Sequence, residues 1–408
     1  MKSRVRPLEA RPRALSMALA FTMVVLSALA AAPWAEAQTY NVLYNFTGGA
    51  DGGYPYYGSL VQDKAGNLYG TTGWGGTYDS YGTVFKVTKS GAETVLYSFT
   101  GGADGAWPYA GLILSGNTLY GTTEAGGTST CQNDYGCGVV FQLNIETGAE
   151  TVLYTFTGSA DGANPYAGLV QDKKGHLYGT TYGGGAYGYG TVFEVAPKTK
   201  KETVLHSFDS TDGAYPQSGL TLNTAGEVLF GTAPGGGSRS WGVVFSLTTN
   251  TRTYTVLYNF KGSSDGGVPW GTMALDAKGN LYGTTWYGGD ISSCESSSCG
   301  TVFEVIPKTK KETVLYAFAG VADGGSPLGG VIRDKKDTLY GTTAGGGPGD
   351  RGVVFELVKG TETVLHSFDY KDGSEPLCGV IMDSSGDLFG TTYGGGSGGY
   401  GVVWEITP

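Results

Sequence analysis

The sequence predicts an all-β fold: a seven-bladed β-propeller of four-stranded antiparallel blades, closed by the N-terminal strand. Three observations carry this prediction. A nine-residue segment of the form LYGTTxGGG recurs seven times, each copy lies among four short apolar runs, and the two ends of the repeat region match complementary parts of one unit. Radial repetition of four-stranded sheets is how such units assemble in propellers.

The repeat has the period of a propeller blade. Its copies begin at residues 68, 119, 177, 229, 281, 339 and 388, so the spacings are 51, 58, 52, 52, 58 and 49 residues. Periods of about 40–50 residues are typical of propeller blades. The two long intervals contain the two pairs of closely spaced cysteines, which places both insertions at one position of the repeat.

Each unit contains four apolar runs separated by turn residues. In the unit around Tyr178 the runs cover residues 168–171, 176–181, 190–195 and 203–208. Val, Tyr, Phe and Thr, which favour strands, dominate the runs, while Gly and Pro stand between them. We therefore expect four antiparallel strands in each of seven units.

The ends of the repeat region predict how the ring closes. Residues 42–46 match the fourth run of a unit, and residues 401–404 match the third. We expect the N-terminal strand, residues 40–47, to complete the last blade, residues 375–408, within a single domain of residues 38–408. Such pairing satisfies sheet edges that an open ring would expose. An open solenoid is the alternative, and the complementary ends favour the closed ring.

Glycine is unusually abundant, and the repeat accounts for it. The chain of 408 residues contains 72 Gly, far above the usual share of about 7%. Its apolar fraction of 40% is sufficient for a core. Gly in the loops permits positive φ and close packing between blades. Seven phosphate-binding loops are the alternative, but no helix is expected after any copy, as the phosphate-binding motifs require.

Residues 1–37 have the pattern of a secretory signal peptide. Five basic residues precede an apolar run at residues 14–32, and Ala35-Glu36-Ala37 offers a cleavage site. We expect cleavage after Ala37 and a secreted protein, periplasmic or extracellular, with an uncleaved membrane anchor as the alternative. Residues 1–37 carry five basic and two acidic residues, so the remaining chain has a formal net charge of −13, against −10 for the whole. We expect a monomer that binds neither nucleic acid nor, after cleavage, membrane.

Five cysteines fit an oxidising compartment. We expect two local disulfides, Cys131–Cys137 and Cys294–Cys299, and a free thiol at Cys378. Metal binding by the thiolate pairs is the alternative, but neither pair has a histidine or a further cysteine nearby.

Four linked motifs point to a known family. LYGTTxGGG, GTVFEV, ETVLYSF and the ADGxxP linker together resemble the GloVer repeat of the choice-of-anchor tandem repeat proteins. The resemblance covers nearly all of the chain after residue 37. It implies a secreted bacterial surface protein without an established biochemical activity, and it supplies no catalytic residues.

No motif for a cofactor or for metal chemistry stands out. His206 and His366 occupy the same position in two different units, where they would lie far apart, and His176 is in a turn. We expect no cofactor. Each unit carries one Asp in its Asp-Gly pair, which we assign to an Asx-type turn. Calcium is the alternative role for these residues, but one Asp per blade offers too few oxygen ligands. They are Asp51, Asp104, Asp161, Asp212, Asp265, Asp323 and Asp372.

Glu124 is the one weak candidate for catalysis. It is the only acid among the seven residues that directly follow the Thr-Thr or Thr-Ala pair of the repeat. Carboxylates perform acid–base chemistry in glycan hydrolysis, which requires two of them. An ordinary loop carboxylate is the alternative.

The loops divide between two faces of unlike charge. Loops from the fourth strand to the next unit, and from the second strand to the third, share one face, here called the loop face. It carries 16 acidic and only four basic residues, whereas the opposite face is nearly neutral. Besides the seven repeated Asp, the acids are Asp79, Glu124, Asp134, Asp209, Asp290, Glu295, Asp350, Asp369 and Glu375, and the bases are Arg239, Lys261, Arg351 and Lys371.

The loop face is also aromatic. The residues that follow the repeated Pro form the channel mouth, with Tyr56, Tyr109, Tyr166 and Trp270 in four blades and Gln217, Leu328 and Leu377 in the others. Trp74, Tyr182, Trp286 and Tyr393 lie in the Gly-rich loops. Packing between blades is the alternative role for these rings, but it does not explain why they vary among blades.

These features favour a non-catalytic secreted propeller that binds a ligand on its loop face. A glycan is the ligand class we expect, because flat rings beside carboxylates and amides suit sugar faces and hydroxyl groups. A glycan hydrolase or lyase on the same scaffold is one alternative, and a surface scaffold for protein partners is another. The fold alone does not choose among them.

Overall fold

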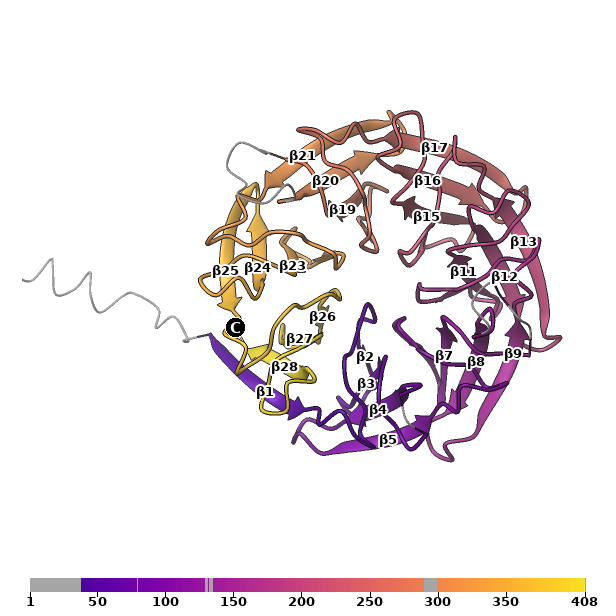
Figure 1. The fold of residues 1–408 in the computed structure, drawn as a ribbon. Helices are drawn as coiled ribbons and strands as arrows, with labels where there is room; N and C mark the ends of the chain where they lie inside the picture. Colours follow the sequence, from indigo (N-terminus) through magenta and orange to yellow (C-terminus); the bar gives the residue numbers. More distant parts are fainter. Residues whose placement is uncertain (1–37, 79, 129–130, 132–134, 290–298, 408) are drawn as a thin grey trace, which may run out of the picture. The chain divides into compact units, whose positions relative to one another are not determined.

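The chain forms a seven-bladed β-propeller, which confirms the predicted fold class. The computed structural model describes residues 38–78, 80–128, 131, 135–289 and 299–407. Residues 40–407 form one compact unit, in which seven four-stranded sheets surround a central axis (Figure 1). Cys294 and the signal-peptide segment, residues 1–37, lie outside the described residues. Within the described residues, no helix is long and apolar enough to cross a membrane.

The strands are named in chain order, and each blade contributes four. Inner strands are β2 (Val61–Gln62), β6 (Ile113–Ser115), β10 (Val170–Gln171), β14 (Thr221–Leu222), β18 (Ala274–Leu275), β22 (Ile332–Arg333) and β26 (Ile381–Met382). Second strands are β3 (Leu68–Thr72), β7 (Thr118–Thr123), β11 (Leu177–Thr181), β15 (Val228–Ala233), β19 (Leu281–Thr285), β23 (Leu339–Thr343) and β27 (Leu388–Thr392). Third strands are β4 (Thr83–Val87), β8 (Val139–Asn144), β12 (Thr191–Ala196), β16 (Val243–Thr248), β20 (Thr301–Ile306), β24 (Val353–Val358) and β28 (Val402–Thr407). Outer strands are β5 (Glu93–Ser98), β9 (Glu150–Thr155), β13 (Lys201–Ser207), β17 (Thr253–Asn259), β21 (Lys311–Ala317), β25 (Thr361–Ser367) and β1 (Thr39–Asn45).

The inner strands are shorter than the sequence predicts. The predicted run at residues 168–171 reduces to the two residues of β10, Val170 and Gln171. The segment before each inner strand bonds to the neighbouring blade instead of to its own sheet. Thr122 Oγ1, for example, donates to the carbonyl oxygen of Ala167 at 3.0 Å, and Thr71 Oγ1 donates to that of Ala110 at 2.9 Å. The first Thr of the repeated Thr-Thr pair therefore ties adjacent blades together at the channel.

The repeated Gly of the second strand makes room for the repeated Phe of the third. A Cβ on Gly179 would lie 2.6 Å from Cζ of Phe193, which is fully buried. In the loop after it, Gly190 has φ of +95° and its Cβ would collide with the carbonyl oxygen of Thr181. Only Gly combines that backbone conformation with that approach. Both glycines are therefore explained by packing alone.

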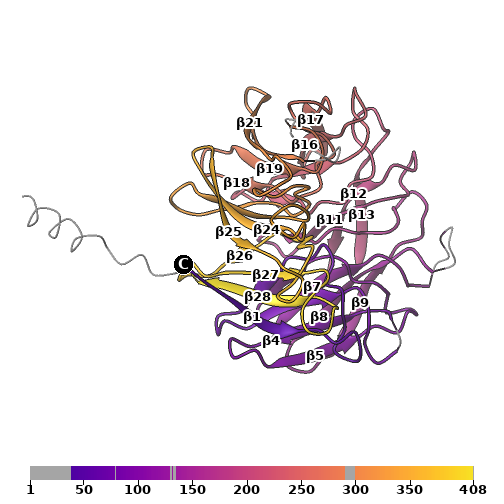
Figure 2. The same ribbon diagram turned by 60° about the vertical axis from the view of Figure 1, so that its left-hand side comes forward.

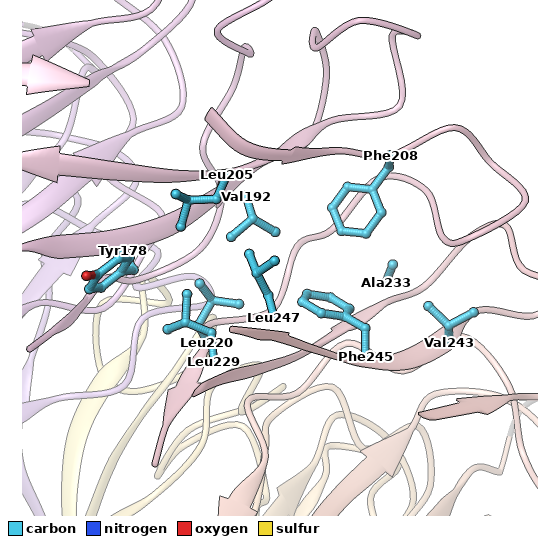
Figure 3. Packing of buried hydrophobic residues seen from close by; sticks show 10 residues of the cluster. All are labelled: Tyr178, Val192, Leu205, Phe208, Leu220, Leu229, Ala233, Val243, Phe245 and Leu247. Carbon is cyan, nitrogen blue, oxygen red and sulfur yellow. The ribbon is translucent and has the colours of Figure 1, made fainter. Parts of the chain in front are cut away.

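The core lies between neighbouring blades. In Figure 3, Tyr178, Val192, Leu205 and Phe208 of one blade meet Leu220, Leu229, Ala233, Val243, Phe245 and Leu247 of the next. Each sheet is buried on both faces, because each blade packs against two neighbours. Apolar burial of this kind contributes about 25 cal/mol for each Å² removed from water.

The outer rim holds a repeated joint built on the Asp of the Asp-Gly pair. In five joints a Tyr at the end of an outer strand donates its hydroxyl to this Asp, as Tyr154 does to Asp161 at 3.0 Å. The outer strand of the next blade provides a half-buried Glu, such as Glu202. The five joints are Tyr44–Asp51–Glu93, Tyr97–Asp104–Glu150, Tyr154–Asp161–Glu202, Tyr258–Asp265–Glu312 and Tyr316–Asp323–Glu362.

Two joints use a different set of residues. His206 Nε2 lies 2.8 Å from Asp212, and Tyr254 of the next blade stacks on the imidazole at 3.8 Å. The hydroxyl of Tyr254 donates to the main-chain carbonyl of Asp212 at 2.7 Å. His366, Asp372 and Tyr40 repeat this arrangement. The repeated Asp is thus a structural residue, although it anchors a neighbouring strand in addition to its own turn.

The N-terminal strand closes the ring. Strand β1 is the outer strand of the last blade and pairs with β28 (Figures 1 and 2). Tyr40 makes the His366 joint described above, and the fully buried Phe46 packs against Phe85 of the first blade at 5.0 Å. The closing strand therefore joins the last blade to both of its neighbours.

Candidate functional site

The two kinds of loop on the loop face lie side by side. An antiparallel bridge joins Ala163 of an Asp-Gly loop to Gly183 of a Gly-rich loop, and Gly53 is bridged to Trp74 in the same way. Equivalent bridges occur in the other blades. The loops therefore form one continuous surface around the channel mouth.

A cavity of about 440 Å³ occupies the centre of the ring. All seven blades line it, from the residues after the repeated Pro to the inner strands. Tyr57, Tyr166 and Trp270 contribute rings to its wall, and Gln217, Leu328 and Leu377 complete the mouth. Cavities of about 300–1,000 Å³ with mainly apolar walls are typical of small-molecule sites.

Tyr57 is a lining residue that the repeat alignment misses. Strand β2 begins six residues after Pro55, whereas every other inner strand begins five residues after its proline, as β10 does after Pro165. The extra residue lengthens the segment that contains Tyr57, whose N–H donates to the carbonyl of Tyr109 in the next blade at 3.1 Å. The Tyr57 ring lies 5.8 Å from that of Trp270, which belongs to the fifth blade. The number of residues between the proline and the inner strand is the sequence feature that distinguishes Tyr57.

Because of this extra residue, the lining residue of the first blade is Tyr57, whereas the sequence predicts Tyr56. Tyr57 lines the cavity, and Tyr56 lies beside it with ring centroids 4.1 Å apart. Tyr56 instead joins the surrounding rings, at 4.8 Å from Tyr109 and 5.3 Å from Tyr393.

Most of the predicted aromatic residues form one chain of ring contacts. Tyr109 stacks on Tyr166 at 6.0 Å, Tyr166 meets Tyr182 at 5.5 Å, and Trp270 stacks on Trp286 at 5.4 Å with an interplanar angle of 10°. Tyr57 links the tryptophan pair to the tyrosines. The structure thus brings together Tyr56, Tyr109, Tyr166, Tyr182, Trp270, Trp286 and Tyr393.

Trp74 is separate from this chain. Its side chain is 46% exposed, and its ring makes no aromatic contact within the described residues. It lies one position further along the Gly-rich loop than Tyr182 does in its own blade. Trp74 is therefore available to a ligand or partner on the loop face, outside the central cavity.

Glu124 is held by residues of the next blade. The hydroxyl of Tyr166 donates to Glu124 Oε1 at 3.0 Å, and the amide of Asn164 approaches the same oxygen at 3.3 Å. Burial raises the pKa of Glu124 above its ordinary value, while the bond from Tyr166 opposes that shift. The carboxylate lies beside the aromatic chain but not among the residues that line the cavity.

Comparison of the blades gives Glu124 a structural role. In the blades that carry Tyr182 and Tyr393 at this position, the ring packs against Tyr215 and Tyr54 of the next blade, at 4.9 Å in both cases. Glu124 and Asn164 occupy these two positions at a third boundary and form a polar pair instead. Its carboxylate therefore fastens two loops together in the same way that the ring pairs do.

Charged side chains are few in the described lining of the cavity. Within the described residues, no group of three or more His, Cys, Asp and Glu side chains is placed to hold a metal ion. The described lining of the cavity contains one charged side chain, Arg333, and no carboxylate. Arg333 is ion-paired with Asp337 and lies 5.7 Å from the centre of the Tyr282 ring.

Two of the predicted cysteine assignments are visible. Cys131 and Cys137 form a disulfide, and Cys378 is a free, buried cysteine. Cys299 is disulfide-bonded, while its predicted partner Cys294 lies outside the described residues. Burial raises the pKa of the Cys378 thiol, and its sulfur is 3.1 Å from Thr391 Oγ1.

These features define a class of protein: a seven-bladed β-propeller with an aromatic central cavity. The chain belongs to the Gloeobacter/Verrucomicrobia repeat family, whose model matches residues 34–228 and 226–408. This match confirms the family that the four repeat motifs indicate. No curated protein matches the chain.

Solved structures show similarity in fold alone. A Bacteroides fragilis protein named as a 6-phosphogluconolactonase is 15% identical with a TM-score of 0.50, over 81% of this chain and 87% of that one. PorZ, a surface component of the type-IX secretion system of Porphyromonas gingivalis, is 14% identical with a TM-score of 0.50, over 86% of this chain and 46% of that one. An oligogalacturonate lyase from Vibrio parahaemolyticus is 10% identical with a TM-score of 0.46, over 87% of this chain and 89% of that one. The first two of these structures have different printed functions, so likeness in fold does not assign an activity to this chain.

Proposed function

We propose that this protein is a secreted, non-catalytic binding protein that holds a glycan at the channel mouth. The observation that supports the proposal is the cavity of about 440 Å³, walled by the rings of Tyr57, Tyr166 and Trp270 and open to neutral polar groups such as Gln217. Flat rings pack against the C–H faces of sugars, and a few polar groups orient the hydroxyls. The mouth is not symmetric, because aromatic rings line it from the first, third and fifth blades and Leu328 and Leu377 from the sixth and seventh. This difference among blades gives a ligand a preferred orientation.

The other two candidates have less support. Glycan hydrolysis requires two carboxylates about 5–10 Å apart, and Glu124 is a single carboxylate engaged by Tyr166 and Asn164. A protein-binding scaffold is favoured by a different observation. Trp74, Tyr78, Tyr135 and Tyr187 of the loop face are 46–64% exposed, and exposed aromatic residues are common at protein interfaces.

A polysaccharide array, followed by calorimetry and analysis of products, tests the proposal. We expect binding without turnover, and a loss of affinity of about tenfold or more in Trp270→Ala, which corresponds to about 1.4 kcal/mol. Tyr187→Ala is the matched control, because this ring is 64% exposed on the same face but does not line the cavity. The control is expected to bind normally.

Three results would change the conclusion. Release of shortened sugars would favour the enzyme. Equal loss of binding in Trp270→Ala and Tyr187→Ala would place the glycan outside the cavity. Failure of every glycan to bind would leave the protein-binding scaffold as the better explanation.

A further inference from the structure

The loop face, on which the channel mouth opens, carries mostly negative charges. The repeated Asp of each Asp-Gly loop lies at the outer rim of this face, bonded to the Tyr or His that ends an outer strand. Glu124 adds a carboxylate within the aromatic chain, 3.0 Å from the hydroxyl of Tyr166. Further acids are Asp209, Asp350, Asp369 and Glu375. A ligand that approaches this face therefore enters a negative potential.

The few cations of the loop face do not offset these acids. Arg351 lies 4.0 Å from Glu375 and over the ring of Tyr370. Burial opposes a lowering of the Asp369 pKa, but main-chain hydrogen bonds from Lys371 and Asp372 lower it. The charge of Lys371 adds to this lowering, so Lys371 is already close to a carboxylate. Arg239 and Lys261, the remaining two, are exposed in outer loops of one blade boundary.

The cavity itself provides no cation to an anionic ligand at its mouth. Arg333, the one charged residue of the described lining, is in the inner strand β22, which leads away from the loop face. Arg333 is already ion-paired with Asp337. Burial opposes a lowering of the Asp276 pKa, whereas hydrogen bonds and then the charge of Arg333 lower it, so Arg333 acts on a second carboxylate as well. The other polar side chains of the described lining are neutral, and they include the amide of Gln217 and the hydroxyls of Ser59, Ser218 and Thr272.

From this arrangement we infer that the ligand is an uncharged glycan and that the site rejects polyanionic sugars such as uronates. The inference rests on the proposed function. A sugar carboxylate placed against Tyr166 and Trp270 would lose hydration without gaining a cationic partner, which is costly for a charged group. It would also lie near the Glu124 carboxylate. A neutral sugar loses only hydroxyl hydration, which Gln217 and main-chain groups can replace.

A matched pair of ligands isolates charge from shape. Oligogalacturonates and their methyl esters share one sugar backbone and differ in charge. Calorimetry at low salt is expected to show at least tenfold weaker binding of the acid form than of the ester. The difference should shrink at high salt, because the Debye length falls from about 30 Å at 0.01 M to about 3 Å at 1 M. Cello-oligosaccharides of the same length serve as a second neutral series.

Two variants complete the test. Glu124→Gln should narrow the difference in affinity between acid and ester. Glu146→Gln, a change of the same charge in the exposed connection between β8 and β9 on the opposite face, should narrow it less. Binding of the acid form as tightly as the ester, lost in Trp270→Ala, would overturn the inference and leave the proposed glycan site intact. Binding of no sugar of either charge would overturn the proposed function and this inference with it.

Discussion

Phe156 follows the outer strand β9 and is fully buried, with its ring 5.1 Å from that of Phe193 in the next blade. Tyr166 is only partly buried, and it lines the cavity. The repeat carries Phe at the first position in all seven units, whereas the second position varies among Tyr, Trp, Gln and Leu. Burial explains both patterns: the first residue fills an interior that every blade shares, and the second faces a space that the blades can shape individually.

Single substitutions should separate these two kinds of aromatic residue. Phe156→Ala is expected to cost about 3–5 kcal/mol of folding free energy, because it leaves a cavity between two blades. Tyr166→Ala should cost about 1–2 kcal/mol, since it removes a part-exposed ring and one hydrogen bond to Glu124. Urea denaturation measures both. Equal losses would show that Tyr166 belongs to the core and would weaken the proposed binding site.

At the scale of elements, the residue that ends one outer strand determines which residue the next outer strand carries in the joint. Where a strand ends in Tyr, the next blade carries Glu, and where it ends in His, the next blade carries Tyr. The ring of Tyr254 stacks on the imidazole of His206 with an interplanar angle of 8°. In the other joints the hydroxyl of the strand-ending Tyr donates a hydrogen bond to the repeated Asp, as Tyr154 does to Asp161.

This pairing predicts energetic coupling. His206→Tyr and Tyr254→Glu are each expected to destabilise the fold, and the double variant should recover stability, with a coupling of about 0.5–3 kcal/mol. Thermal or urea unfolding of the four proteins gives the coupling energy. His206→Tyr combined with Tyr40→Glu, from the distant joint, is the matched control and should be additive. Additivity within the His206–Tyr254 pair would contradict the paired joint.

The Glu-containing joints predict that stability falls as the pH rises through neutrality. Burial, and then the nearby Asp carboxylate, raises the pKa of each joint Glu from 4.5 to about 7. Lys200 partly opposes this shift at Glu150, and Tyr258 and Lys261 partly oppose it at Glu312. The joint Glu residues are Glu93, Glu150, Glu202, Glu312 and Glu362. Their Oε1 atoms are buried without a hydrogen-bond partner among the described residues. Between pH 4.5 and about 7 the folded chain holds protons that the unfolded chain has released. The free energy of unfolding is therefore highest at the acid end of this range, and it falls as the pH rises and these Glu ionise.

Melting temperatures measured across this pH range check the sign. Each carboxylate is about half buried, so the effect of one residue is modest and the five together give the measurable slope. Replacing all five by Gln should flatten the curve and raise the melting temperature at pH 8. Exposed Glu146→Gln is the control and should leave the slope unchanged. A melting temperature that rises from pH 5 to pH 8 in the wild-type chain would refute the assignment.

At the scale of the whole molecule, the period, strand number and closure could be predicted from the sequence, because each is repeated or matched in the chain itself. The side chains around the cavity were harder to place, because they depend on departures from the repeat. Tyr57 follows from one extra residue after Pro55, and the structural partner of Glu124 lies in the next blade. The repeat pattern contains neither signal, so it predicts Tyr56 at the lining and no partner for Glu124.

The closing strand provides the last test, since the ring depends on it at both boundaries. Deleting residues 39–47 removes the pairing of β1 with β28, the Tyr40–His366 stack and the Phe46–Phe85 contact. The exposed edge of β28 is then free to pair with other chains. We expect a lower melting temperature and aggregation that increases with protein concentration. Adding a synthetic peptide of residues 39–47 should restore the monomeric, stable form, while the same peptide with Tyr40→Ala and Phe46→Ala should not. An unchanged melting curve in the deleted chain would show that the seven blades hold together without this strand.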